Sequence, residues 1–314
     1  MITLTADAPE SLTRSTPAQR PPLRVGLVQH CWRADREELC RVLADAVSRA
    51  AAAGARIVFM PELTLYRYPG DSPAPSPPAA AAEDIRNGPT FAFAAEVARA
   101  NGVFVQSSLY EKAAPDDGSD DGLGYNTAIL VSPAGELVAR VRKLHIPDSE
   151  GYREAAYFRP GPTNGDPYPV YEPEGLGARL GLPTCWDQWF PEVARAYSLR
   201  GAEVLVYPSA IGSEPEFPEF NSEPRWRQVI VGNGIANSLF MIVPNRTGDE
   251  GPLQFYGSSF ISDPYGRILL QAPRDKEALL IADLDLDQRR DWLESFPLLS
   301  MRRPDTYGSL TEPA

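Results

Sequence analysis

The feature that most constrains this chain is that its second half repeats the pattern of its first. Three pairs of segments, one member from each half, have similar sequences: "RVGLVQ" with "RLGLPT", "GARIVFMPE" with "GAEVLVYPS", and "NTAILVSPAGELVARV" with "GSSFISDPYGRILLQA". The last pair predicts two β-hairpins, each around Pro-x-Gly. Each half therefore predicts two β–α units followed by a hairpin, in the same order.

Amphipathic stretches between the strand-like segments predict helices near residues 35–53, 90–100, 190–200 and 223–237, with Asp35 and Thr90 as expected N-caps. The strand-like "RIVFMP" is apolar on both faces and therefore needs cover on both. Two mixed sheets stacked face to face, with helices outside, satisfy both halves. We expect an α/β fold: a four-layer α-β-β-α sandwich with an internal pseudo-twofold repeat.

The ends of the chain and one internal segment do not follow this pattern. Residues 1–22 have no apolar segment typical of a signal peptide, and we expect a disordered tail there. Residues 68–84 are proline-rich and aperiodic, which predicts a surface loop. The main domain is expected over 23–300, followed by an extended tail over 301–314.

Composition excludes several classes of function. The 314 residues carry a net charge of −12, which argues against binding to nucleic acid or to anionic membrane surfaces. No stretch reaches the roughly 18 apolar residues of a membrane span. The three cysteines (Cys31, Cys40 and Cys185) lack paired spacing, which favours a reducing, cytoplasmic location. With two histidines, we expect neither a metal site nor a Ser-His-Asp triad, and no cofactor.

Polar residues follow three of the expected strands. Glu62 comes after "RIVFMP", Lys143 after "ELVARVR", and Cys185 after "RLGLPT". Open sheets place ligands beyond the carboxyl ends of their strands. Cys185 also precedes a helix-like stretch, whose N-terminus is expected to lower the pKa of the thiol. A buried, inert cysteine is the alternative. Together the three residues supply a base, a cation and a nucleophile.

The motifs "PEL", "RKLHIP" and "CWD" around these residues, in this order, resemble the nitrilase superfamily, and the similarity runs from about Leu23 to Tyr307. The resemblance implies hydrolysis of carbon–nitrogen bonds by a Glu-Lys-Cys triad within an α-β-β-α sandwich. "CWDQWFPE" and "RWRQVIVGNGIAN" are similar to the branch of N-carbamoylputrescine amidases and β-ureidopropionases. In that branch "GYREAAYF" carries a second glutamate, here Glu154, whereas "LTLYRYPGD" after Glu62 departs from the branch's pattern.

The resemblance implies a role for each residue. Cys185 is the expected nucleophile and Glu62 the expected general base. Lys143 and the backbone N–H of Trp186 are expected to hold the oxyanion. Glu154 is expected to hold Lys143 or the attacking water by a charge-assisted hydrogen bond.

The expected substrate is a small carbamoylated amine, cleaved through a covalent cysteine intermediate. Glu214, in the acidic segment 209–224, is a candidate partner for a cationic tail, whereas Arg225 and Arg227 suit a carboxylate. The alternatives are an amidase, a nitrilase or a β-ureidopropionase acting on another small amide or ureido compound, and a catalytically silent member of the fold. The segment "LLSMRRPDTYGSL" is a candidate for crossing to a partner in a homodimer or larger homo-oligomer.

Overall fold

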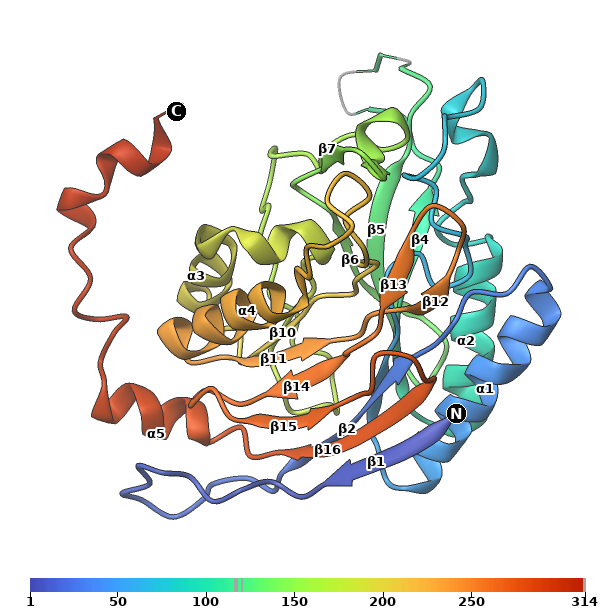
Figure 1. Cartoon of the computed structure of the whole chain (residues 1–314). Helices are drawn as coiled ribbons and strands as arrows, with labels where there is room; N and C mark the ends of the chain where they lie inside the picture. The colour runs from blue at the N-terminus through green and yellow to red at the C-terminus, as the bar shows by residue number, and fades with distance from the viewer. Residues whose placement is uncertain (116–117, 120, 313–314) are drawn as a thin grey trace.

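Two large mixed β-sheets carry this α/β fold (Figure 1). The computed structural model describes residues 1–115, 118–119 and 121–312. The first sheet has the strand order β1 (Ile2–Ala6), β16 (Ala278–Leu284), β2 (Leu23–Gln29), β3 (Ile57–Phe59), β4 (Phe104–Glu111), β5 (Tyr125–Val131), β6 (Leu137–Arg142). The second sheet has the order β15 (Ile268–Gln271), β14 (Phe260–Ser262), β11 (Phe240–Val243), β10 (Val204–Val206), β9 (Leu180–Gly181).

The two sheets repeat one topology. In the first, β2, β3 and β4 pair in parallel, and β5 and β6 continue the sheet antiparallel. In the second, β9, β10 and β11 pair in parallel, and β14 and β15 continue it antiparallel. Helices separate the parallel strands at matching places: α1 (Arg36–Ala52), α2 (Pro89–Asn101), α3 (Pro191–Leu199) and α4 (Glu223–Asn237). The hairpins and helices expected from the sequence repeat are therefore present.

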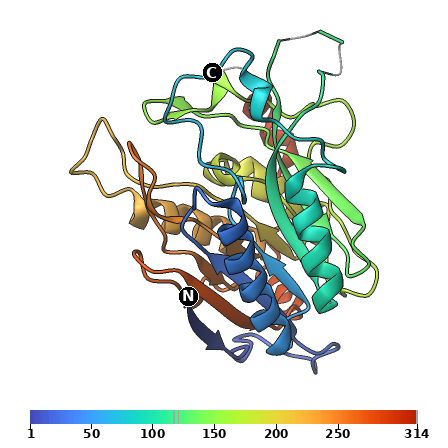
Figure 2. The same cartoon turned by 90° about the vertical axis from the view of Figure 1, so that its right-hand side faces the viewer.

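Side chains that alternate along the central strands enter different cores. Ile57 and Phe59 of β3 lie in the same core as Val204 and Val206 of β10, between the sheets. Val58, between them in sequence, packs with residues of α1 and α2, which lie side by side on the outer face of the first sheet (Figure 2). The outer face of the second sheet packs against α3 and α4. Strands covered on both faces explain the continuous apolar runs.

One glycine in each half permits this close packing. A side chain at Gly26 of β2 would lie 3.0 Å from Ala50 of α1. A side chain at Gly181 of β9 would lie 2.5 Å from both Tyr197 of α3 and Leu205 of β10. The glycines of "RVGLVQ" and "RLGLPT" therefore occupy equivalent places, where a helix approaches the strand backbone.

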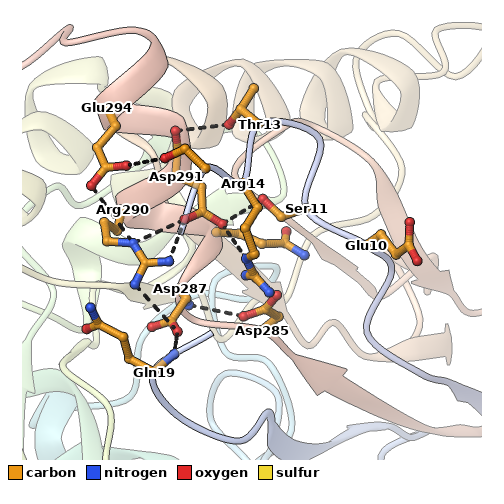
Figure 3. A network of polar contacts seen from close by, with 12 residues as sticks. Glu10, Ser11, Thr13, Arg14, Gln19, Asp285, Asp287, Arg290, Asp291 and Glu294 are labelled. Atoms are coloured by element: carbon orange, nitrogen blue, oxygen red, sulfur yellow. Dashed lines mark hydrogen bonds and ion pairs between the residues drawn. The ribbon is translucent and has the colours of Figure 1, made fainter. Parts of the chain in front are cut away.

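The expectation of a disordered tail over residues 1–22 is wrong. The segment begins with β1, which pairs in parallel with β16 at the sheet edge. It then runs along α5 (Gln288–Ser295), where Arg14 contacts Asp285 and Asp291 at 2.5 and 2.9 Å (Figure 3). The segment lacks a periodic apolar pattern because backbone hydrogen bonds and ion pairs hold it, and neither leaves such a pattern in sequence.

The remaining elements are short. They are the paired strands β7 (Asp148–Ser149) with β8 (Tyr152–Arg153) and β12 (Thr247–Asp249) with β13 (Gln254–Tyr256), and 3₁₀ turns at Pro78–Ala81, Glu154–Ala156, Cys185–Trp189, Pro304–Thr306 and Gly308–Thr311.

The two expected helix caps have different outcomes. Asp35 caps α1 as expected, but α2 begins at Pro89 after Gly88, so Thr90 is not its cap. No helix in the described part of the chain is long and apolar enough to cross a bilayer.

The C-terminal segment leaves the body of the molecule after α5 (Figure 1). It carries two 3₁₀ turns, so it is not extended throughout as expected. Met301 and Leu310 are 75% and 65% exposed, which is unusual for large apolar side chains. The segment therefore offers apolar surface that its own domain does not cover.

Candidate active site

The three strand-end residues singled out in the sequence converge with Glu154 in the fold. Glu62 follows β3, Lys143 follows β6, and Cys185 follows β9 on the facing sheet. Lys143 Nζ donates to Glu62 Oε1 at 2.8 Å and to Glu154 Oε2 at 2.7 Å. Cys185 is 5% exposed and the other three side chains are buried still more deeply. The structure thus places two carboxylates around one ammonium, with the thiol nearby.

Lys143 remains charged despite its burial. Burial alone would lower its pKa, but the adjacent carboxylates of Glu154 and Glu62 outweigh it and raise the pKa above the ordinary value. An ammonium has three N–H donors, and the two carboxylates use two of them. The third remains for a further acceptor.

Glu154 has the opposite character. Burial raises its pKa to about 7, and the charge of Glu62 adds to this effect while Lys143 opposes it. Its second oxygen, Oε1, accepts a hydrogen bond from the hydroxyl of Tyr68 at 2.9 Å. Tyr68 is fully buried, although it begins the segment expected to be a surface loop. Each oxygen of Glu154 thus has one donor.

Glu62 has one oxygen engaged and one free. Oε1 accepts from Asn126 Nδ2 at 2.7 Å as well as from Lys143. Oε2 is buried and has no hydrogen-bond partner within the described residues. A buried carboxylate oxygen without a donor is costly, and such atoms are concentrated where a proton is to be accepted.

The loop that carries Glu62 is fixed from the other half of the molecule. Arg246, fully buried after β11, donates from Nη2 to the carbonyl oxygens of Glu62, Leu63 and Tyr66 at 2.9 to 3.0 Å. Its Nη1 donates to Glu250 at 2.6 Å. Leu63 has φ of 49°, a conformation that a leucine rarely adopts without such restraint.

Cys185 begins a 3₁₀ turn, Cys185–Trp189, which precedes α3. Its φ is 40°, in the left-handed region, and its N–H donates to the carbonyl of Pro208 at 3.0 Å. Burial and then the charge of Glu62 raise the pKa of the thiol well above its ordinary value, although Lys143 opposes the shift. The expectation of a lowered thiol pKa is wrong, because a five-residue turn offsets little of the burial. The resting thiol is therefore protonated.

Asp187 joins the cysteine turn to the segment after Lys143. Its Oδ2 accepts from the N–H of Thr184 at 3.0 Å, and its Oδ1 accepts from the N–H of His145 at 3.0 Å. The ring Nδ1 of His145 lies 2.7 Å from the same oxygen, and the ring stacks on Phe190 at 3.7 Å. His145 is therefore a structural hydrogen-bonding residue.

A cavity of about 380 Å³ opens above Cys185. Its walls are mainly apolar and include Trp186, Trp189, Ile211, Phe217 and Phe220. Trp186 is the second residue of the 3₁₀ turn, and the first N–H groups of a helix have no partner inside it. Its backbone N–H is therefore without a partner inside the turn.

The charged candidates for substrate binding separate in the fold. Glu214 and Arg225 line the cavity. Arg227 does not, because it forms an ion pair with Glu223 at 2.5 Å. Glu216 and Glu219, in the same acidic segment as Glu214, are exposed. The acidic segment thus contributes one of its carboxylates to the cavity that Cys185 also lines.

Comparison with known proteins assigns this arrangement to a family. Residues 24–294 match the carbon-nitrogen hydrolase family. The chain belongs to this family. N-carbamoylputrescine amidase from Arabidopsis thaliana is 39% identical over 73% of this chain and 75% of its own length. Citrullinase from Francisella tularensis is 32% identical over 92% of this chain and 98% of its own length.

One solved structure bears on the cysteine of this carbon-nitrogen hydrolase. It is a variant of the amidase from Nesterenkonia sp. AN1 with acrylamide attached to its active-site cysteine by Michael addition. That chain is 26% identical, has a TM-score of 0.72, and the match covers 92% of this chain and 99% of the other. The carbon-nitrogen hydrolase described here is accordingly an amidohydrolase for non-peptide carbon–nitrogen bonds.

Three further residues of this hydrolase were missed in the sequence. Tyr68 and Asn126 each donate to a carboxylate of the site, and Arg246 holds the Glu62 loop. Asn126 lies in β5, next to the strand that leads to Lys143, and this proximity was an available signal. Tyr68 and Arg246 reach the site only through long-range packing, for which the sequence offers no periodicity.

Proposed function

We propose that this carbon-nitrogen hydrolase cleaves a small carbamoylated amine through a covalent intermediate on Cys185. The observation that carries the proposal is the buried cluster of Glu62, Lys143 and Glu154 beside a protonated thiol at the floor of a small cavity. The cluster contains a base, a cation and a nucleophile, and the reaction needs nothing further from the protein.

In the first step, the sulfur of Cys185 attacks the ureido carbon while its proton passes to the free Oε2 of Glu62. The carbonyl oxygen becomes an oxyanion, which the third N–H of Lys143 and the N–H of Trp186 stabilise. Removing one such donor costs about 10²–10³ in rate. Glu154 is a positioning residue here, because it holds Lys143 against Glu62 by charge.

In the second step, the carbon–nitrogen bond breaks and Glu62 returns the proton to the departing nitrogen. The carbonyl group stays on the sulfur as a thioester-like intermediate. Glu62 then takes a proton from water, which attacks the same carbon and frees the thiol. The raised pKa of Cys185 suits this cycle, since the thiolate exists only while Glu62 holds its proton.

The names of the relatives support a ureido substrate. N-carbamoylputrescine and citrulline both end in a carbamoylated amine. The apolar cavity walls are compatible with a short hydrocarbon chain next to that group. An amide or nitrile substrate, or no turnover at all, is the alternative that the following experiment distinguishes.

The test is intact mass spectrometry during incubation with small ureido, amide and nitrile compounds. We expect a transient increase in mass equal to the carbamoyl or acyl group, and none in Cys185→Ala. An adduct from amides alone would replace the ureido proposal with an amidase. No adduct and no turnover with any compound would favour a catalytically silent protein.

We also infer a finer architecture and an assembly. The two sheets and their helices form the four layers of an α-β-β-α sandwich, related by an internal pseudo-twofold repeat, as the order of the three apolar cores supports. The hydrolase domain spans 23–300 with β1 added to its edge. The largely exposed segment 301–312 packs on a partner in a homodimer or larger homo-oligomer. A strict monomer in light scattering at micromolar concentration would reject this assembly.

A further inference from the structure

The cavity above Cys185 carries one charge of each sign. Glu214 and Arg225 both line it. Over residues 1–115, 118–119 and 121–312, neither side chain has an ion-pair partner, and the two do not pair with each other. Both side chains therefore contribute to the cavity wall, Glu214 half-buried and Arg225 exposed to solvent.

Glu214 is held in place by its backbone. The three N–H groups that precede it are all hydrogen-bonded: Ile211 to Asn245 Oδ1 at 3.0 Å, Gly212 to the Tyr152 hydroxyl at 2.9 Å, and Ser213 to the Gln254 carbonyl at 2.8 Å. The Tyr152 hydroxyl also donates to the carbonyl of Ser213 at 3.0 Å. Such restraint lowers the entropy that binding would otherwise cost.

Arg225 comes from a different element, the first turn of α4. Its guanidinium lies over the ring of Phe220 at 4.9 Å, and its Nη1 donates to the carbonyl of Asn221 at 3.3 Å. Stacking fixes the plane of a guanidinium and leaves its other N–H groups for a carboxylate. Arg227, two residues further on, is neutralised by Glu223 and provides a matched control.

The charges lie in reach of the same ligand as the thiol. Tyr152 lines the cavity together with Cys185 and Glu214, and burial, together with the charge of Glu214, raises its pKa. Apolar side chains of Trp186, Ile211 and Phe217 complete the wall. A ligand with a reactive group at one end, a short hydrocarbon chain and charges at the other end would find a partner for each part among these lining residues.

We propose that the substrate is an ω-ureido α-amino acid, whose ammonium binds Glu214 and whose carboxylate binds Arg225. This inference rests on the hydrolase function proposed above. A ureido amine would leave Arg225 without a partner, and a ureido acid would leave Glu214 without one. A zwitterionic head group satisfies both, because each charge meets a preorganised charge of opposite sign.

The experiment compares four ureido compounds that differ only at the far end. Citrulline carries both charges, N-carbamoylputrescine only the ammonium, 5-ureidopentanoate only the carboxylate, and butylurea neither. We expect kcat/KM to be highest for citrulline and to fall at least about tenfold for each charge removed, the loss typical of a hydrogen bond to a charged group.

Two variants then separate the charges. Glu214→Gln should lower kcat/KM at least about tenfold for citrulline and N-carbamoylputrescine, and leave 5-ureidopentanoate unchanged. Arg225→Gln should lower kcat/KM at least about tenfold for citrulline and 5-ureidopentanoate, and should leave kcat/KM for N-carbamoylputrescine unchanged. Glu216→Gln and Arg227→Gln, which lie outside the cavity lining, should alter none of the four.

The outcomes are distinct. Faster turnover of N-carbamoylputrescine than of citrulline, with no effect of Arg225→Gln, would replace the amino acid by a diamine derivative. Faster turnover of 5-ureidopentanoate than of citrulline, with no effect of Glu214→Gln, would replace the proposed amino acid substrate by a ureido acid. Turnover of amides with none of the four ureido compounds would reject this inference and the ureido proposal, but leave the thiol chemistry standing.

Discussion

The segments that follow β2 and β9 occupy the same place in the two halves, yet they hold different chemistry. His30 follows β2, and Cys185 follows β9. His30 is fully buried, and its Nδ1 lies 3.0 Å from the carbonyl oxygen of Cys31. Burial and then the charge of Arg246 lower its pKa to about 4, so the ring is neutral at pH 7. Its Nε2 has no hydrogen-bond partner among the residues that the structure describes.

The other two strand ends differ in the same way. In the paired sequences, Glu62 corresponds to Ser209 and Lys143 to Arg274. Ser209 is buried and donates to the carbonyl of Tyr207 at 2.9 Å, whereas the side chain of Arg274 is 51% exposed. A repeated topology thus offers two places for a site. The cluster of Glu62, Lys143 and Cys185 occurs at only one of these two places. Packing constrains which residues can occupy the interior of a strand, whereas the residues at strand ends are free to differ between the two halves.

The largest effect expected is the loss of the nucleophile. Cys185→Ala should reduce turnover by at least about 10⁴-fold, because no other group nearby can form the covalent intermediate. Cys31→Ala and Cys40→Ala should keep nearly the parental rate. Steady-state kinetics with matched melting temperatures test this, and activity that survives in Cys185→Ala would end the thiol mechanism.

Lys143 and Arg274 provide the next contrast. Lys143→Met removes the buried cation at the oxyanion and should lower kcat by about 10²–10³-fold. Arg274→Met removes the corresponding exposed cation and should leave kcat near the parental value. Equal losses in both variants, with unchanged melting temperatures, would mean that both strand ends serve the reaction.

Glu62 and Ser209 test the base. Glu62→Gln keeps the size but cannot accept a proton, so kcat should fall by at least about 10²-fold. Acylation and deacylation should both slow, so mass spectrometry should detect little covalent intermediate. Ser209→Ala should turn over nearly as the parent does. If the kcat of Glu62→Gln stays within a few-fold of the parental value from pH 6 to 9, the base lies elsewhere. Glu154 is then the next candidate.

The smallest effect expected is a shift in pH dependence caused by Tyr68. Protonation of Glu154 removes a charge that holds Lys143, so kcat/KM should fall below about pH 7. The Tyr68 hydroxyl stabilises the ionised carboxylate, and Tyr68→Phe should therefore raise the pKa of Glu154 and move the acid limb to higher pH. If the pH profile of kcat/KM is the same in Tyr68→Phe and the parent, Tyr68 contributes only to packing.

Sequence reasoning identified residues that meet in the fold where strand ends carried the signal. Glu62, Lys143 and Cys185 were found because apolar runs mark strands and the carboxyl ends of parallel strands meet. The same method missed Tyr68, which lies in a proline-rich segment, and it misjudged residues 1–22. In both cases the stabilising contacts join segments far apart in the chain: a side-chain hydrogen bond for Tyr68, and strand pairing and ion pairs for residues 1–22. Such contacts produce no periodic pattern in the sequence.

The sequence by itself determined the repeated order of strands and helices, the glycines that let α1 and α3 approach their strands, and the residues that end each strand. Hydrophobic periodicity and side-chain size are local properties, so they can be read without coordinates. Only the tertiary structure decided that Lys143 bonds Glu62 and Glu154 at once, and that the thiol is protonated. It also placed Glu214 and Arg225 in one cavity. These properties depend on burial and on distances between segments far apart in the chain, and the folded arrangement alone sets both.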